Sequence, residues 1–474
     1  YAKKHNCHDE LVHATDSFGF TPMHIACRRG RTDVMEYFMS QEIIDRPTWI
    51  RSNIDQVGSP LNMAGNEEIA EMLVCVMAYF DTPEADFIST THSDGSSPLH
   101  HASIEGKECV VKYLLWAMDD VDKRDALVLK TCAEFGTALH LAANIGVAQR
   151  LLDGVSAQKI DELLFIIDST GATALHTASK RGEVKVMELV IQHCEEKETL
   201  VMLKDNGNNT PLHFAQSSES SKLLMDVLHI EQQVAMLSTV NRNGNTPLHT
   251  ACTTSELDVI HHLIGILLED ANTTKNILEL PNNDGDTLIM LVATKALTDE
   301  FELLLRLMVD VGSDVSLVIS YQNKRAENLL HIVAKSMNFD FYTTVLAENC
   351  RELETSALQA TDQEGNTPLH YAAANFNTRL FAQFLMRLSQ CVRKQICNHE
   401  NVNSYNLHTI ITAEQRSPEE ANNFFLRNML NDKEQDFLQA AYHLDMREYL
   451  DHTNFGIQFD PSIRSVLMYA LLQY

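Results

Sequence analysis

The chain has 474 residues, of which 45% are hydrophobic and 22% are charged, and its formal net charge is −28. This composition is that of a folded protein, so disorder is excluded as the default. The excess of acidic residues argues against nucleic acids and anionic membranes as partners, because both are bound mainly through cations.

A four-residue word recurs along the chain. In chain order it reads TPMH, SPLN, SPLH, TALH, TALH, TPLH, TPLH, TLIM, NLLH, TPLH and YNLH. Its fourth residue, here called the histidine position, is His24, Asn62, His100, His140, His176, His213, His249, Met290, His331, His370 and His408. Successive histidine positions are 36 to 41 residues apart, which predicts a stack of similar units instead of several unrelated domains.

The stretch 241–270 shows the structure expected of one unit. It opens on Asn-Arg-Asn-Gly, a turn sequence in which Gly244 can adopt a positive φ. Thr246 is a suitable N-cap, and Pro247 is a suitable first residue of a short helix. The residues of this helix expected to be buried are Leu248, Ala251 and Cys252.

A second helix is expected after Thr253, Thr254 and Ser255, which break the first one. Its apolar residues recur at helical spacing, and the expected buried stripe is Leu257, Ile260, Leu263, Ile264 and Leu267. Neither helix can bury its apolar side alone. Stacked copies must therefore cover one another.

Five copies contain extra residues between the second helix and the next turn. They are DKRDALVLKTC, QKIDELLFIIDST, EKETLVMLKDN, EQQVAMLSTVN and TKNILELPNN. Each begins with polar residues and continues with a short apolar patch. This pattern predicts an added helical turn whose apolar residues pack against the stack, and it predicts short hairpins between units.

Nine of the 21 histidines stand at the histidine position. Imidazole both donates and accepts hydrogen bonds, so it can join a turn to the start of a helix. Catalysis would need one histidine with a distinct partner, whereas these recur in equivalent places. We therefore expect a structural role for them, and no catalytic residue.

The phrase GxTPLHxAAxxGxxxxVxxLL is the signature of the ankyrin repeat, and the chain resembles an ankyrin-repeat solenoid. The resemblance implies an all-α fold of about 11–12 helix-turn-helix repeats, several of them degenerate, with extended linkers between them. We expect the solenoid over residues 16–415. Residues 1–15 are then the end of a preceding repeat or a cap, and 416–474 are a degenerate repeat and a helical cap.

The resemblance implies binding of protein partners through the concave surface of the inner helices. The acidic surface favours partners with basic segments. The candidate binding residues follow the inner helices or stand at turn tips: Arg28, Arg29, Glu105, Lys180, Arg181, Arg242, Asn243, Glu364, Asn375 and Phe376. The expected function is that of an intracellular scaffold, adaptor or regulatory protein.

Two alternatives remain open at this point. Long ankyrin stacks also form the cytosolic part of TRPA-like ion channels, and they occur as regulatory arrays of larger enzymes. The chain begins with Tyr1 instead of Met, so we expect it to be part of a longer protein. Membrane association is expected only if that protein is a channel.

Motifs for other chemistry are missing from the sequence. There is no Walker A loop, GxGxxG, GxSxG or HExxH motif, and no cofactor is expected. His5, Cys7, His8 and His13 crowd together but match no zinc spacing, so no metal site is expected. The ten cysteines form no CxxC pair, which favours a reducing, cytoplasmic location. The longest apolar run, at 72–80, is too short to span a membrane.

Overall fold

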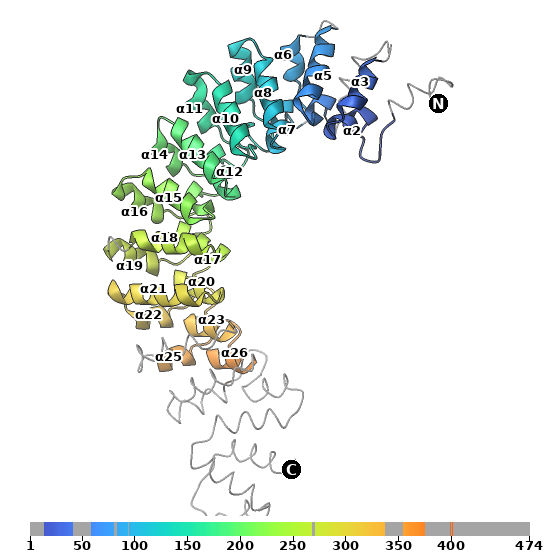
Figure 1. The fold of residues 1–474 in the computed structure, drawn as a ribbon. Helices are drawn as coiled ribbons and strands as arrows, with labels where there is room; N and C mark the ends of the chain where they lie inside the picture. Colours follow the sequence, from blue (N-terminus) through green and yellow to red (C-terminus); the bar gives the residue numbers. More distant parts are fainter. Residues whose placement is uncertain are drawn as a thin grey trace, which may run out of the picture. The chain divides into compact units, whose positions relative to one another are not determined.

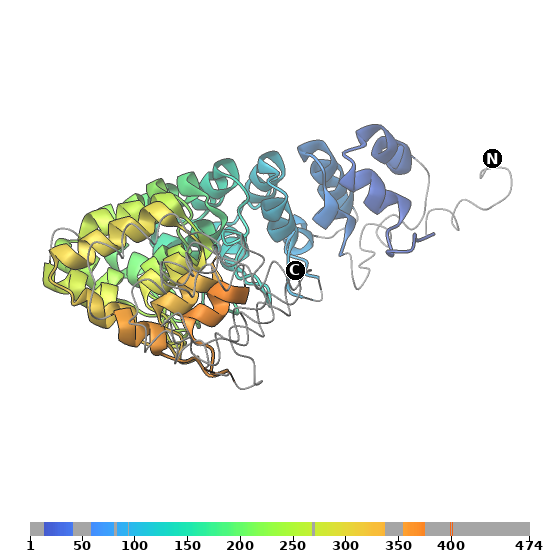
Figure 2. The same cartoon turned by 90° about the horizontal axis from the view of Figure 1, so that it is seen from below.

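The computed structural model describes residues 14–40, 58–79, 83–92, 94–267, 271–336, 354–374, 399 and 401. These residues form helices joined by turns, and no strand occurs among them (Figure 1). The view turned by 90° likewise shows only helices in the coloured parts (Figure 2). The all-α prediction is therefore confirmed. The predicted end regions lie almost entirely outside the described residues, so the predicted domain bounds stay a prediction.

The chain forms two compact units, which are described separately. The first comprises Tyr1–Arg242 with His261–Leu263, and the second comprises Asn243–Ile260 with Ile264–Tyr474. In both, a repeat contains up to three helices. The inner helix begins with the four-residue word, the second helix follows it, and a third helix precedes the next turn.

The inner helices of the first unit are α2 (Pro22–Arg28), η2 (Pro60–Met63), α7 (Pro98–Ile104), α12 (Ala174–Arg181) and η4 (Pro211–Phe214). Its second helices are α3 (Thr32–Ser40), α5 (Glu67–Tyr79), α8 (Glu108–Trp116), α10 (Ile145–Gly154), α13 (Val184–His193) and α15 (Ser218–Asp226). Its third helices are α6 (Glu84–Ile88), α9 (Val121–Leu129), η3 (Ala157–Lys159) with α11 (Ile160–Phe165), α14 (Lys197–Met202) and α16 (Ile230–Leu237).

The second unit repeats this order. Its inner helices are α17 (Pro247–Thr254), α20 (Leu288–Thr294), α23 (Leu329–Lys335) and α26 (Pro368–Ala374). Its second helices are α18 (Leu257–Leu267) and α21 (Thr298–Asp310), and its third helices are α19 (Ala271–Glu279), α22 (Val315–Ser320) and α25 (Glu354–Gln359). Successive inner helices of this unit pack against one another: α17 contacts α20, α20 contacts α23 and α23 contacts α26.

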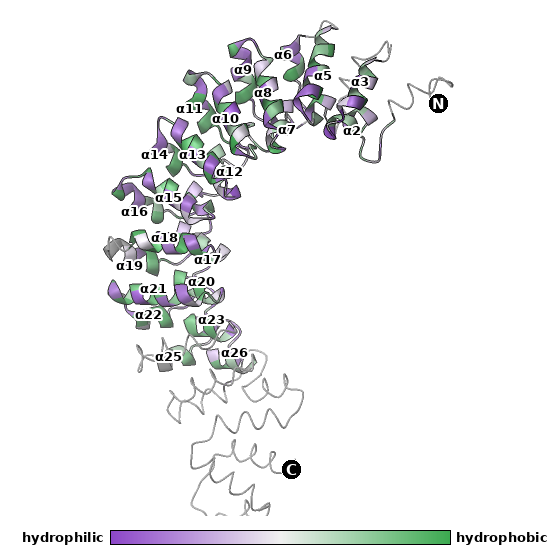
Figure 3. Cartoon of the chain, in the orientation of Figure 1, coloured by the Kyte–Doolittle hydropathy of each residue, from purple (hydrophilic) through white to green (hydrophobic). Residues whose placement is uncertain are grey.

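Each helix is amphipathic and buries one side against its neighbours (Figure 3). The repeat that begins at Thr246 has its N-cap and first helical proline where the sequence predicts them. The predicted buried residues Leu248, Ala251 and Cys252 are also buried. One residue of the predicted second stripe is wrong. Leu257 is 42% exposed and Val259 is buried instead, because the buried stripe starts one turn later on α18.

The inner helix is short in three copies, contrary to the expectation of a helix in each. At Asn62 and His213 it is a single 3₁₀ turn, and at His140 it is a run of turns. Four residues after these positions stand Asn66, Asn144 and Ser217, whose side chains accept hydrogen bonds from the first turn of the second helix. An early N-cap for the second helix ends the inner one.

The extra residues form the third helix, which confirms the predicted helical turn. Its buried pair stands 13 and 12 residues before the next histidine position: Phe87 and Ile88, Leu127 and Val128, Leu163 and Leu164, Leu200 and Val201, Met236 and Leu237, Ile277 and Leu278, and Ala357 and Leu358. This spacing is constant while the repeat length varies. The variation in length is therefore taken up before the third helix.

The turns between repeats are tight hairpins, as predicted. In one of them Asp168 N donates to Ala172 O, and Gly171 N donates to Asp168 O. Successive turns are also joined to each other, since Asn206 N donates to Thr170 O at 2.8 Å and Asn283 N donates to Asn243 O at 2.9 Å. The close approach and the positive φ favour glycine at this position, although Asn208 and Ala326 hold it in two copies.

A pair of substitutions tests this close approach. Gly244 has a φ of +74°, and a Cβ there would lie 2.6 Å from Asn283 N, so Gly244→Ala should lower the free energy of unfolding. We expect a loss of about 2 kcal/mol. Ala326 holds the equivalent position with a φ of +60°. Ala326→Gly should raise the same free energy by about 1 kcal/mol. Urea unfolding measures the change in the free energy of unfolding for both variants. Changes of the same sign would contradict the idea that this position favours glycine.

Candidate protein-binding surface

The histidines hold successive repeats together. In each of the eight described copies, Nδ1 lies 2.6 to 3.0 Å from the side-chain oxygen of the N-cap residue and accepts the backbone N–H of that residue. In seven copies Nε2 donates to a backbone carbonyl at the end of the third helix or in the turn that follows it, for example His140 to Ala172 O at 3.1 Å. His408 lies outside the described residues.

Burial favours the neutral form of five of these imidazoles. Burial lowers the pKa of His100 and of His370 to about 4, and it also lowers the pKa of His140, His176 and His331. A proton on Nδ1 would face the backbone N–H that Nδ1 now accepts. Seven of the eight described rings are hydrogen-bonded through both nitrogens in a similar way, which fits a structural role for them.

The two copies without histidine show what the ring contributes. Asn62 accepts the Ser59 hydroxyl at 2.8 Å, but its buried Nδ2 has no hydrogen-bond partner. Met290 has only a weakly accepting thioether, and the buried Thr287 hydroxyl is left without a partner. The amide makes only one of the two contacts that the histidine makes, and the thioether leaves the N-cap hydroxyl unsatisfied.

The described candidate binding residues are exposed at the ends of inner helices or at turn tips. Arg28 and Arg29 end α2, Glu105 caps α7, and Lys180 and Arg181 end α12. Arg242, Asn243 and Glu364 lie at turn tips. Asn375 and Phe376 lie outside the described residues. Two neighbouring pairs are thus brought together, Arg28 with Arg29 and Lys180 with Arg181.

The first pair borders a hollow on the surface of the first unit. The hollow measures about 540 Å³ and is lined by Asp16, Phe18, Phe20, Ile25, Arg28 and Arg29. The Arg28 guanidinium lies 5.7 Å from the centre of the Phe20 ring. Phe18 is 73% exposed and Ile25 is 43% exposed. Two cations and three apolar side chains therefore face solvent together, with one carboxylate among them.

Two further cations lie over aromatic rings of the next repeat. Lys180 Nζ is 5.8 Å from the ring centre of Phe214, and Lys335 Nζ is 4.0 Å from that of Tyr371. Arg28, Lys180 and Lys335 all stand four residues after a histidine, and both of these rings stand one residue after the next histidine. Sequence analysis missed Phe18, Phe20, Phe214, Lys335 and Tyr371, although aligning the copies on the histidine position would have revealed the last three.

Many acidic residues stand at the starts of the second and third helices. The first turns of the described inner helices carry none. The first turns of the second and third helices carry Asp33, Glu67, Glu68, Glu84, Asp86, Glu108, Asp122, Asp161, Glu162, Glu198, Glu219, Glu231, Asp258, Asp299 and Glu300. Acidic side chains near a helix N-terminus stabilise the helix. The starts of the described inner helices thus lack acidic residues, whereas the ends of these helices carry the cations Arg28, Lys180, Arg181 and Lys335 together with Glu105.

Other kinds of site were searched for in the described part of the chain. No group of three or more His, Cys, Asp or Glu residues there is arranged to hold a metal ion. Among those same residues, no helix combines the length and apolar character required for a membrane span. Cys27 and Cys252 are fully buried thiols, and burial raises the pKa of each to about 12. These two are core residues, as predicted.

Family models match the regions described above. A model of three ankyrin repeats matches residues 99–205 and 139–233, and single ankyrin-repeat models match residues 18–45 and 243–274. The chain is an ankyrin-repeat protein with an all-α solenoid fold. Ankyrin repeats are a protein-interaction fold and are in general not enzymatic.

Proteins similar to this chain include a human ion channel and an ankyrin-repeat domain of known structure. Human transient receptor potential cation channel subfamily A member 1 is 30% identical over 133 residues, which are 27% of this chain and 10% of that protein. The chain thus spans about a tenth of that relative's length. The ankyrin-repeat domain of Bcl-3, a member of the IkappaB family, is 19% identical with a TM-score of 0.38, covering 54% of this chain and all of that domain. The latter likeness is too weak to support an argument.

Proposed function

We propose that this protein is an intracellular scaffold or adaptor whose partner binds the inner-helix ends. The observation that carries the proposal is the recurrence of a cation over an aromatic ring at Arg28, Lys180 and Lys335. Lys335 also forms an ion pair with Glu327. Arginine and aromatic side chains are the residues most often found at the energetic centre of protein interfaces. Free thiols at Cys27 and Cys252 fit a cytoplasmic location.

The hollow beside Arg28 is the proposed anchor point. Phe18, Phe20 and Ile25 would pack around an apolar side chain of the partner, and Arg28 with Arg29 would bind carboxylates next to it. We therefore propose a partner segment that is acidic and carries an aromatic residue. The sequence predicts instead a partner with basic segments on this same concave surface, and the following experiment separates the two.

Two synthetic peptides distinguish the possibilities. One carries glutamates around a phenylalanine, and the other carries lysines in place of the glutamates. We expect the acidic peptide to bind more tightly by fluorescence anisotropy, with an affinity that falls as salt is added. Arg28→Glu with Arg29→Glu should weaken it about tenfold or more.

The matched control reverses two exposed lysines on second helices, Lys112→Glu with Lys185→Glu. It changes the net charge by the same amount and should leave the affinity nearly unchanged. Tighter binding of the basic peptide, or equal losses in both double variants, would contradict the proposal. Phe18→Ala should weaken the acidic peptide without altering its salt dependence.

A second candidate function is favoured by one observation. The identity of 30% over 133 residues to the human cation channel supports a role as the cytosolic arm of a TRPA-like channel. In that role the repeats would transmit or regulate a signal to a pore elsewhere in a longer protein. The complete coding sequence tests this directly: six apolar segments of about twenty residues each would support it, and their absence would remove it.

A further inference from the structure

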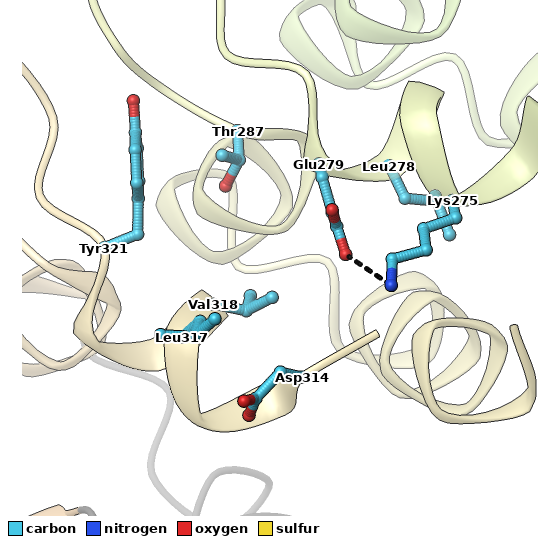
Figure 4. A pocket seen from close by; sticks show the side chains of 8 residues that line it. All are labelled: Lys275, Leu278, Glu279, Thr287, Asp314, Leu317, Val318 and Tyr321. Carbon is cyan, nitrogen blue, oxygen red and sulfur yellow. Dashed lines mark ion pairs between the residues drawn. The ribbon is translucent and has the colours of Figure 1, made fainter. Parts of the chain in front are cut away.

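A second hollow lies between two successive third helices of the second unit. It measures about 270 Å³ and is lined by Lys275, Leu278 and Glu279 of α19, by Thr287, and by Asp314, Leu317, Val318 and Tyr321 around α22 (Figure 4). Its volume is close to the lower end of the range typical of small-molecule sites. It lies on the third helices, so the proposed partner surface on the inner helices does not include it.

The floor of this hollow carries an unsatisfied hydroxyl. Thr287 is 6% exposed, and its Oγ1 has no hydrogen-bond partner. Figure 4 shows the hydroxyl directed toward the space between Val318 and Glu279. In the histidine-containing copies, the imidazole Nδ1 lies within hydrogen-bond distance of the N-cap side chain, whereas Met290 stands at the histidine position here. A buried hydroxyl without a partner is costly, so a ligand that supplies one gains affinity.

The length of the repeats explains why space is left here. The histidine positions 249, 290 and 331 are 41 residues apart in each step, the longest steps in the chain. Since the third helix keeps its distance to the following histidine position, the extra length lies before it. The result is a loosely covered α22, on which Leu317 is 66% exposed and Tyr321 is 38% exposed.

The walls and the rim define the kind of ligand. Leu278, Leu317, Val318 and the Tyr321 ring are apolar surfaces that suit a flat or branched hydrocarbon body. At the rim stand two carboxylates, Glu279 and Asp314, and one amine, Lys275. Lys275 donates to Gly312 O at 3.1 Å and lies 4.0 Å from Glu279. The rim is therefore net negative and disfavours an anion.

We infer that this hollow binds a small amphipathic molecule with an aromatic body and a neutral or cationic hydrogen-bonding group. The body lies between Leu317, Val318 and Tyr321. The polar group of the ligand forms a hydrogen bond with Thr287 Oγ1, which is directed toward the hollow. The Thr287 hydroxyl lacks a partner because Met290 replaces histidine in this repeat. We therefore do not expect an equivalent site in the repeats that contain the histidine.

Four ligands with the same ring test the inference on the full chain. They are 2-phenylethanol, phenethylamine, phenylacetate and ethylbenzene, measured by calorimetry and by NMR of labelled leucine and valine methyl groups. We expect the alcohol and the amine to bind more tightly than ethylbenzene, and phenylacetate to bind most weakly. The methyl signals of Leu278, Leu317 and Val318 should shift. No shift at these methyl groups, or tightest binding of phenylacetate, would overturn the inference.

Thr287→Val separates a ligand contact from a structural role. This variant removes the unsatisfied hydroxyl while keeping the shape, so its melting temperature should be equal or higher. Its affinity for 2-phenylethanol should fall about tenfold, which corresponds to one hydrogen bond. Its affinity for ethylbenzene should not change. Thr298→Val, outside the hollow, is the matched control, and equal losses for both ligands in Thr287→Val would overturn the inference.

Discussion

Replacing His140 by alanine is expected to destabilise the first unit by about 3 kcal/mol. His140 is 2% exposed, its Nδ1 lies 2.9 Å from Thr137 Oγ1, and its Nε2 donates to Ala172 O at 3.1 Å. Alanine would leave the hydroxyl, the Thr137 N–H and the carbonyl without this partner, beside a cavity the size of the ring. Urea unfolding followed by circular dichroism measures the loss.

The Asn62 copy provides a graded control for this experiment. Since Asn62 accepts the cap hydroxyl and its Nδ2 finds no partner, His140→Asn should keep one of the two contacts. We expect it to cost about half as much as alanine. His261→Ala, on the exposed side of α18, should change the free energy of unfolding by less than about 0.5 kcal/mol. Similar effects for all three variants would show that the histidine position has no special role.

Mild acid is expected to destabilise the solenoid strongly. The pKa of His100 and His370 is lowered from 6.5 to about 4, because burial disfavours the charged ring. Above the unfolded pKa both states are neutral, so stability is unaffected there. As the pH falls from 6.5 toward 4, the two histidines are protonated in the unfolded chain but stay neutral in the folded chain. The free energy of unfolding therefore decreases. Each of the two histidines should cost about 2 kcal/mol at about pH 5.

This effect is measured by urea unfolding at about pH 7, 6 and 5. Asp33, Asp94 and Glu327 have lowered pKa values, so these carboxylates stabilise the folded state until the pH falls below their ordinary pKa range. The loss of stability caused by the histidines begins at a higher pH. His100→Asn should be less stable at neutral pH, but its stability should depend less on pH in this range. If the free energy of unfolding did not change between pH 7 and pH 5, the conclusion that these buried rings are neutral would be contradicted.

Much of the repeat could be predicted from the sequence because its signals are local. Thr246, Pro247 and Gly244 specify a cap, a first helical residue and a turn within a few residues of one another, and the structure confirms all three. The third helix could also be predicted, since its polar start and apolar patch are contiguous. Leu257 was predicted incorrectly because the helical period alone does not show which turn of α18 first meets its neighbours.

The candidate surface could be predicted only in part. Arg28, Arg29, Lys180 and Arg181 are visible as cations after the inner helices, but their aromatic neighbours come from other turns or repeats. Lys180 and Phe214 are 34 residues apart in sequence, and only stacking brings them together. The excess of acidic residues also concealed the basic ends of the inner helices, because a net charge carries no information about position.

The sequence by itself determined the repeat, the role of its histidines and the family, because each depends on residue types at fixed short spacings. Only the tertiary structure decided which residues meet between repeats: the carbonyl that each imidazole reaches, the rings beneath Lys180 and Lys335, and the hollow beside Thr287. Those contacts depend on the distance between stacked layers. That distance is set by packing along the whole unit, and no local spacing encodes it.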